Sequence, residues 1–306
     1  MHEIIEDKQM ETVIAPISVD ALCAEIGNLG AENLLITRGD FDVFLAKADD
    51  IPQLLREIGR LRELTFRQAG EGTGKSLDID AYDQNYSNLF IWDRTKKCIV
   101  GGYRMGMGER IKSAEDLDQF YINSLFKINP SVIPILNKSI ELGRSYIVPE
   151  YQKGYLPFFL LWQGILHVLI KNEQYQYLIG PVSISKYYSG QSKSLIIEFV
   201  KRHFFNSELA HCFTPRTPFE ACIEKGNLDK MIDDVNGSKL KDLETFLKTI
   251  EPSHIKVPVL LKQYTKLNAK FISFNIDPNF SDALDGLMIL DIKKLPDSIL
   301  ELLNEK

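Results

Sequence analysis

The chain has 306 residues, 44% hydrophobic, 10% aromatic and 25% charged, the proportions of an ordinary globular protein. Its 36 Lys and Arg against 42 Asp and Glu give a formal net charge of -6, so no overall positive field recruits nucleic acid. Four cysteines without a CxxC pair exclude a disulfide scaffold. The acidic N-terminus lacks a signal-peptide pattern, and the most apolar stretch, 156–170, is shorter than the roughly 20 residues of a membrane span. We therefore expect a cytoplasmic protein, with at most peripheral contact at the inner membrane.

The first predicted elements alternate between strands and helices. Alternating apolar and polar side chains predict a strand over 41–48, and apolar residues at three-to-four spacing predict a helix over 49–67, capped by Asp49 or Asp50. A Gly-, Asp- and Asn-rich loop at 70–86 follows, then a hairpin of strands at 88–92 and 98–107. A helical stretch at 117–126 precedes a strand at 139–148, a helix at 156–171 and a strand at 177–183. The last three elements predict a βαβ unit with a parallel strand pair.

The remaining third is mainly helical and then returns to strands. We expect helices over 185–247 with a Pro-rich break at 214–218, a short helix at 258–267, strands at 270–275 and 287–292, and a helix at 298–304. The fold class is therefore α/β with a mixed sheet. The expected organisation is an N-terminal segment (1–40), a core (41–184), a helical insertion (185–250), and C-terminal strands and a helix that complete the core (251–306).

Residues 69–76 spell AGEGTGKS, which satisfies a relaxed phosphate-loop pattern. A phosphate loop joins a buried strand to a helix, so that backbone N–H groups and the helix dipole point at the phosphates. Here the segment follows a predicted helix and leads into LDIDAYD, an acidic run that would repel phosphate. We therefore interpret it as a glycine-rich loop of other purpose.

Several charged residues interrupt segments that should be buried. They are Arg62 and Arg67 on the first helix, Asp78, Asp80 and Asp83 in the loop, Arg104 in a glycine-rich strand, and Glu141 with Arg144 in the central strand. Buried charges need partners. Because side chains alternate along a strand, one cluster of all these charges requires a bend near Gly143. A structural ion-pair network and a catalytic site both fit this pattern.

The same residues carry a resemblance. The runs LRELTFR (61–67), LDIDAYD (77–83), IVGGYRM (99–105) and ELGRSYIVPEY (141–151) resemble a branch of the GNAT acyltransferase superfamily. That branch includes acyl-homoserine-lactone synthases, ornithine N-acyltransferases and bacterial glycine N-acyltransferases, some of them called hemolysin-like. The stretch 257–290 is similar to the C-terminal signature of the ornithine and glycine group. The resemblance implies a GNAT fold with a helical insertion and a C-terminal extension.

The resemblance implies transfer of a fatty, 3-hydroxylated acyl group from acyl carrier protein to the α-amine of glycine or ornithine, with glycine preferred, in aminolipid biosynthesis. A base must remove a proton from the ammonium group before it attacks the thioester, and Glu141 is the candidate. Arg144 would orient Glu141 or hold the acidic loop. Arg104 would be a structural group or a clamp for the substrate carboxylate. Asp80 and Asp83 would receive the amino acid's ammonium group or brace Arg62 and Arg104.

The donor is expected to be acyl carrier protein or acyl-CoA, with no tightly bound cofactor. Backbone N–H groups around Tyr146 to Val148 would stabilise the oxyanion, and Gln152, Lys153 and Gly154 would receive the pantetheine phosphate at a helix N-terminus. These three residues only partly match the superfamily's Q/R-x-x-G-x-G/A loop, which favours a protein-borne donor. A basic surface for the acidic carrier could come from Lys186, Lys193, Lys201 and Arg202.

The sequence also bears on a metal site, on related enzyme activities and on a noncatalytic role. His203, His211, Cys212 and Cys222 match no tetrahedral zinc spacing, so we expect no metal. Within enzymes the alternative is an acyl-CoA-dependent or lactone-synthase-like enzyme. From another class, a noncatalytic acyl-binding module would use the charges only for structure.

Overall fold

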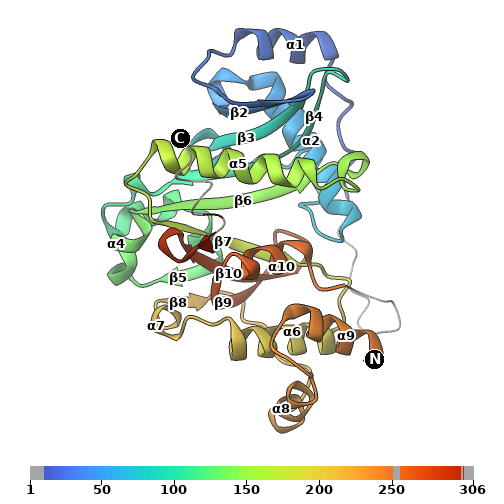
Figure 1. The fold of residues 1–306 in the computed structure, drawn as a ribbon, viewed down its shortest axis with the longest axis vertical. Coiled ribbons are helices and arrows are strands. Elements are labelled where there is room, and N and C mark those ends of the chain that lie inside the picture. Colours follow the sequence, from blue (N-terminus) through green and yellow to red (C-terminus); the bar gives the residue numbers. More distant parts are fainter. Residues whose placement is uncertain (1–9, 251–255, 298, 300–306) are drawn as a thin grey trace. The chain divides into compact units, whose positions relative to one another are not determined.

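The computed structural model describes residues 10–250, 256–297 and 299 (Figure 1). The chain divides into two compact units. Unit 1 comprises residues 1–104, 144–167 and 279–281, and unit 2 comprises residues 105–143, 168–278 and 282–306. Strand β6 (Ser139–Ile147) and helix α5 (Leu156–Lys171) therefore contribute residues to both units.

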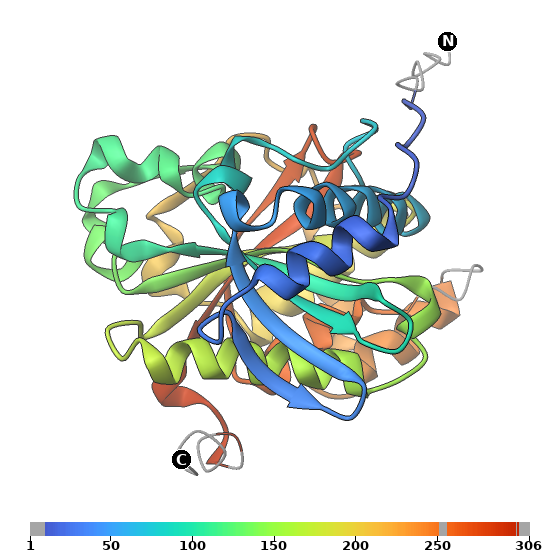
Figure 2. The same cartoon turned by 90° about the horizontal axis from the view of Figure 1, so that it is seen from above.

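Unit 1 is a sheet with a helix on each face. Its strands follow the order β1-β2-β3-β4-β6, and β1 and β3 both pair antiparallel with β2. The side chain of Leu89 on β3 faces Gly164 of α5, while its neighbour Asn88 bonds to Arg62 of α2. Figure 2 shows the two helices on opposite faces of these strands. The other helices and strands of this unit are α1 (Val19–Asn28), β1 (Leu34–Arg38), β2 (Phe41–Lys47), α2 (Pro52–Gln68), β3 (Ser87–Asp93) and β4 (Cys98–Met107).

Helix α2 is capped differently from the prediction. Ile51 occupies the N-cap position with no side-chain bond, because Ala48–Asp50 form a 3-10 turn (η1) instead. The cap comes from α1: the Glu25 carboxylate accepts the backbone N–H groups of Gln53 at 2.7 Å and Leu54 at 2.8 Å. The prediction of Asp49 or Asp50 as the cap was wrong, because a residue distant in sequence supplies it.

The glycines of β4 allow its neighbouring strands to approach closely. A Cβ on Gly101 would lie 2.5 Å from the carbonyl oxygen of Tyr146 on β6, and one on Gly102 would lie 2.6 Å from the carbonyl oxygen of Leu89 on β3. Real Cβ atoms essentially never come this close to another heavy atom. The glycines thus serve backbone packing within the sheet.

Unit 2 continues from the first half of β6 in the order β6-β7-β10-β9. β6 and β7 are parallel, as the predicted βαβ unit requires, while β10 is antiparallel to both β7 and β9. A two-stranded sheet joins β5 to β8. The elements of this unit include β5 (Phe126–Ile128), β7 (Tyr177–Ile184), β8 (Phe213–Pro215), β9 (Lys270–Asp277), β10 (Ala283–Asp291), α3 (Ile122–Leu125), α4 (Ile133–Leu136), α6 (Gly190–His203), α7 (Ser207–Ala210), α8 (Lys225–Asp233), α9 (Leu240–Ile250) and α10 (Val259–Lys266).

Short 3-10 turns join several of these elements. They are η2 (Ala81–Gln84), η3 (Gly108–Arg110), η4 (Ala114–Gln119), η5 (Pro130–Val132), η6 (Pro149–Tyr151) and η7 (Ile292–Lys294). The helix predicted over 117–126 is instead η4 followed by α3. The predicted helix at 298–304 lies outside the described residues except for Ile299. Among the described helices, none has both the length and the apolar character needed to cross a membrane.

Candidate active site

Two fully buried arginines anchor the acidic loop in unit 1. Arg62 of α2 donates to Asp83 at 2.7 Å and to Asn88 at 2.8 Å, and Arg104 of β4 donates to Asp83 at 3.1 Å. Burial raises the pKa of the Asp83 carboxyl, but the two guanidiniums outweigh burial and lower this pKa to about 2. Asp83 is thus ionised at neutral pH and braces both arginines.

Asp80 is the partly exposed member of the network. Its Oδ1 accepts from Arg104 Nη1 at 2.6 Å and from the Tyr82 backbone N–H at 2.9 Å, so it also caps η2. Its side chain is 28% exposed, against 0% for Asp83 and 1% for Asp78. Arg104 itself is 1% exposed and its guanidinium also lies over the rings of Tyr82 and Tyr86. Among the three carboxylates, Asp80 is therefore the one that a ligand can reach.

Arg144 reaches the same loop because the strand bends at this residue. Its φ is +51°, a left-handed conformation that is rare outside glycine and marks the local bend. Its Nε lies 2.9 Å from Asp78 Oδ2, and its Nη2 lies 3.5 Å from Asp80 Oδ2. Phe280, from the turn between β9 and β10, covers the guanidinium at 4.7 Å. A bend beside Gly143 was predicted, and the structure has it at Arg144.

The AGEGTGKS segment binds a carboxylate of its own chain. The fully buried Glu63 of α2 accepts the N–H and hydroxyl groups of Thr73 and the N–H of Gly74, at 2.8 to 3.1 Å. Arg67 donates to the same carboxylate at 2.8 Å. The N–H groups of Thr73 and Gly74 are therefore occupied by a carboxylate of the chain itself. This geometry fits the prediction of a glycine-rich loop with a purpose other than phosphate binding.

Glu141 is a buried carboxylate in unit 2. It is 1% exposed and accepts the backbone N–H groups of Tyr121 and Ile122, each at 2.9 Å. The Tyr121 hydroxyl in turn donates to the buried Asp277 of β9 at 2.5 Å. Asp277 and Tyr121 therefore fix the backbone that holds the Glu141 carboxylate in one orientation.

The predicted oxyanion region is the end of β6. The Val148 N–H donates to the Val100 carbonyl at 2.9 Å and is therefore already occupied. The Tyr146 side chain packs edge-on against Phe66, and burial raises the pKa of its hydroxyl. Of the residues predicted to stabilise the oxyanion, Tyr146 contributes a buried ring, and the backbone N–H of Val148 contributes a hydrogen bond to the neighbouring strand.

The predicted phosphate-binding residues lie in the loop before α5. Gln152 donates its side-chain amide to the Ile147 carbonyl at 2.8 Å, and the Gly154 N–H donates to the Tyr151 carbonyl at 3.4 Å. Gln152, Lys153 and Gly154 are exposed. The ammonium group of Lys153 is thus the positive charge that this loop presents to solvent, and Glu150 is exposed in the same loop.

The predicted basic surface is smaller than the sequence indicated. Lys193 is only 9% exposed, and Arg202 pairs with Asp229 and Asp233. Lys186 and Lys201 remain as exposed cations. Within the described part of the chain, no group of three or more His, Cys, Asp or Glu side chains is arranged to hold a metal ion.

Sequence reasoning missed four residues that build the site: Glu63, Tyr121, Asp277 and Phe280. Asp277 carried a usable signal, because it is an acidic residue at the end of an apolar strand-like run, FISFNID. Tyr121 carried none, since its contribution to Glu141 is a backbone N–H group.

Comparisons with known proteins identify relatives of this chain. Residues 61–163, which include most of the ion-pair network, match the family model described as Acetyltransferase (GNAT) domain. A glycine N(alpha)-acyltransferase of Phocaeicola vulgatus is 29% identical over 300 residues, covering 94% of this chain and 90% of that protein. A glycine N(alpha)-acyltransferase of Bacteroides thetaiotaomicron is 32% identical over 220 residues, or 68% of this chain and 64% of that protein. A solved CoA-dependent acyl-homoserine lactone synthase is 13% identical with a TM-score of 0.39, over 85% of this chain and 86% of that one.

Proposed function

Because this chain is a GNAT acyltransferase related to glycine N(alpha)-acyltransferases, we propose that it transfers a 3-hydroxy fatty acyl group from acyl carrier protein to the α-amine of glycine. The observation that carries the proposal is the buried ion-pair network that ends in the partly exposed Asp80. The positive and negative charges of this network balance, and a ligand can reach one of its carboxylates. Such a site suits a small ligand that carries one positive and one negative charge, as glycine does.

The acceptor would bind where Asp80 and Arg144 meet. Their closest contact is 3.5 Å, too long for a strong hydrogen bond, and Asp80 is 28% exposed, so its Oδ2 can still accept from a ligand. The ammonium group of glycine would bind Asp80, and its carboxylate would bind Arg144. Arg62, Arg104 and Asp83 are positioning residues in this proposal, because all three are buried and paired with one another.

Glu141 is the proposed base. It takes a proton from the ammonium group, directly or through water, and the freed amine attacks the thioester carbonyl carbon. The C–N bond forms, the C–S bond breaks, and the leaving thiolate takes up a proton to give the pantetheine thiol. Tyr121 and Asp277 support this role by holding the Glu141 carboxylate in a fixed orientation.

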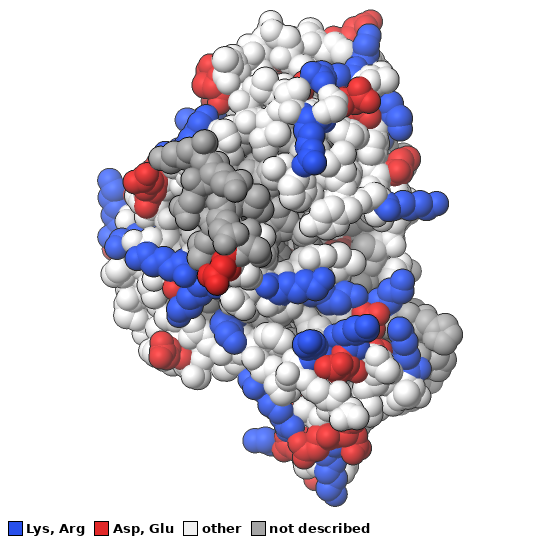
Figure 3. Space-filling model, viewed as in Figure 1, with Lys and Arg blue, Asp and Glu red and all other residues white. Residues whose placement is uncertain are grey.

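Carrier protein is the proposed donor, with acyl-CoA as the alternative. Acidic carrier proteins bind basic surfaces. Lys266 at the end of α10 and Lys270 at the start of β9 are exposed in unit 2, and Figure 3 shows Lys and Arg side chains on the face that it views. Lys153 at the start of α5 would bind the phosphate of the pantetheine arm.

The test follows the acyl group on the carrier protein. Purified protein is incubated with 3-hydroxypalmitoyl carrier protein and glycine, ornithine or no amine, and loss of the acyl group is read from the intact mass of the carrier. We expect glycine-dependent loss, with kcat lowered roughly 100- to 10,000-fold in Glu141→Gln. Gln keeps an acceptor for one of the two backbone N–H groups that Glu141 binds, so circular dichroism is used to check that the variant is folded. Equal rates with and without amines would contradict the proposal and favour the acyl-binding module.

A further inference from the structure

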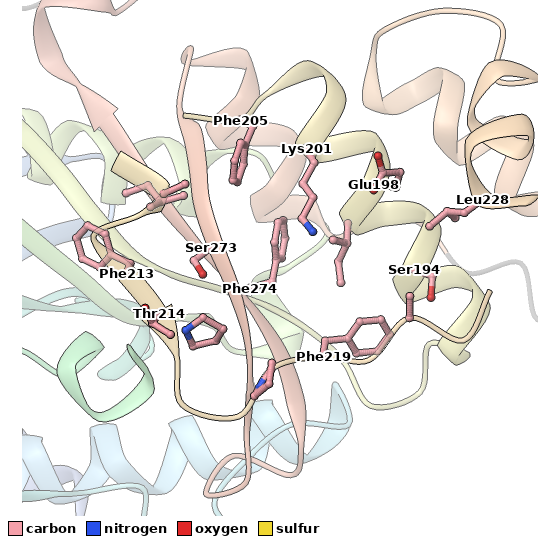
Figure 4. Close-up of a pocket in the computed structure, with 16 residues that line it drawn as sticks. Ser194, Glu198, Lys201, Phe205, Phe213, Thr214, Phe219, Leu228, Ser273 and Phe274 are labelled. Carbon is pink, nitrogen blue, oxygen red and sulfur yellow. The ribbon is translucent and has the colours of Figure 1, made fainter. Parts of the chain in front are cut away.

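Unit 2 contains a pocket of about 410 Å³ that the proposed chemistry does not use (Figure 4). One wall is a stripe of α6, formed by Ser194, Ile197, Glu198 and Lys201. The spacing of these residues is that of one helix face. The volume lies within the range of about 300 to 1,000 Å³ that is typical of small-molecule sites.

The pocket exists because the chain leaves the outer edge of β9 and later rejoins it. Around Phe271 the outer edge of β9 is bonded to residues 204–206, and Ile276 donates to the Thr217 carbonyl. Between these two points, residues 207–216 arch away from the strand. Ile272, Ser273 and Phe274 of β9 face the space beneath this arch.

Eleven of the sixteen residues that line the pocket are apolar, among them Phe205, Phe213, Phe219, Phe274, Ile197 and Leu228. The Ser194 hydroxyl is already used, since it donates to the Gly190 carbonyl at 2.8 Å and accepts the Cys222 N–H at 3.0 Å. An apolar chain lying against Ser194 therefore breaks no hydrogen bond of this hydroxyl.

Lys201 supplies a positive charge to the lining of the pocket. Figure 4 shows its ammonium group extending toward Phe274, whereas the carboxylate of Glu198 is turned away from that ring. Lys201 forms no ion pair with any other residue that the structure describes. The single positive charge of Lys201 matches the single negative charge of a carboxylate. A single carboxylate is the head group that fits.

We propose that this pocket binds the acyl chain of a long-chain carboxylate, with Lys201 holding the carboxylate. The ligand would be a free fatty acid or an N-acyl amino acid, which share this chemistry. The proposal does not depend on the reaction proposed above, because binding is measured without turnover.

The test is calorimetric titration of the full chain with decanoate, N-decanoylglycine, decanol and acetate. Decanoate and N-decanoylglycine should both bind, and the tighter of the two identifies the source of the natural ligand. Acetate should not bind, because it lacks the chain. In Lys201→Met, the affinity for decanoate should fall about tenfold, as expected for a lost charge-assisted hydrogen bond, while that for decanol stays unchanged.

Two further variants locate the bound chain. Lys225→Met on α8 removes an exposed lysine that does not line the pocket and should leave decanoate binding unchanged. Ala210→Trp fills the pocket from α7 and should abolish it. Absence of decanoate binding in the wild type would overturn the proposal. Equal decanoate affinity in the wild type, Lys201→Met and Ala210→Trp would also overturn it.

Discussion

At the residue scale, charge placement explains why the acidic loop is ordered. Asp83 is fully buried between Arg62 and Arg104, so each charge compensates the others. Removing one member of such a group leaves an unpaired buried charge, at a cost of about 3 to 5 kcal/mol. The stability of unit 1 should therefore depend on the ionisation of one carboxyl group.

Asp83→Asn tests this dependence. Because the pKa of Asp83 is lower in the folded than in the unfolded chain, its contribution is complete above about pH 4 and is lost as the pH falls toward 2. The variant should be about 3 to 5 kcal/mol less stable at pH 7 and should lack this acid-side loss. Urea unfolding measured between pH 2 and pH 7 checks both effects. Asp229→Asn, at an exposed site, should behave like wild type; an unchanged acid slope in Asp83→Asn would contradict the account.

Glu71 should have the opposite pH dependence. Burial raises the pKa of the Glu71 carboxyl from 4.5 to about 7. Between these two pH values, the folded chain therefore holds a proton on Glu71 that the unfolded chain has lost. Stability then falls as the pH rises from about 4.5 to above 7. Glu71→Gln should raise stability at pH 8 by roughly 1 to 3 kcal/mol and leave it unchanged at pH 4. Thermal melts at the two pH values are the measurement, and an equal shift at both would refute the assignment.

Sequence could predict the members of the network but not all of their partners. Arg62, Arg104 and Arg144 interrupt apolar segments, which signals that carboxylates must meet them. That Asp83 would be buried and Asp80 reachable depends on how the loop docks. The partners of Glu141 are backbone N–H groups about 20 residues earlier, and no side-chain pattern signals such groups.

At the element scale, periodicity located most of the fold. α2, the β3–β4 hairpin, β6, α5 and β7 all lie close to their predicted positions, because each has a long apolar repeat or a clear turn. The prediction missed α1 and β1, whose strand Leu34–Arg38 is largely exposed at the edge of its sheet. It also missed the three-residue strand β8, which is too short to show a period and forms by pairing with β5.

Docking of the acidic loop on α2 depends on Gly59. A Cβ there would lie 2.6 Å from Ile79 Cγ1, and the Asp78 N–H donates to the Gly59 carbonyl at 3.1 Å. In an open helix, glycine-to-alanine stabilises by about 1 kcal/mol. Gly59→Ala should instead destabilise the protein by about 1 to 3 kcal/mol, the cost of overpacking, and lower activity by displacing Asp80.

Gly226 of α8 is the matched control. A Cβ at Gly226 meets nothing within 4 Å, so Gly226→Ala should be neutral or stabilising by up to about 1 kcal/mol. The denaturant midpoints and initial rates of Gly59→Ala and Gly226→Ala test whether the acidic loop packs on Gly59. Equal stabilisation by the two substitutions would show that the loop does not pack on Gly59.

At the scale of the whole molecule, the net charge of -6 opposes an acidic carrier protein, so any attraction must be local. Raising the ionic strength from about 0.1 M to 1 M shortens the Debye length from about 10 Å to 3 Å. The KM for acyl carrier protein should rise several-fold over this range. The KM for the same acyl group on uncharged pantetheine should change little. Steady-state rates with both donors test this, and equal salt dependence would argue against a carrier-protein surface.

The most direct test of the central claim is to identify the product. Purified protein is supplied with 3-hydroxypalmitoyl carrier protein and an equimolar mixture of amino acids that includes ornithine, and acylated species are identified by mass spectrometry. We predict N-(3-hydroxypalmitoyl)glycine as the main product, formed roughly 100- to 10,000-fold more slowly by Glu141→Gln. No acylated amino acid from either carrier-protein or CoA donors, with the protein folded, would contradict the account.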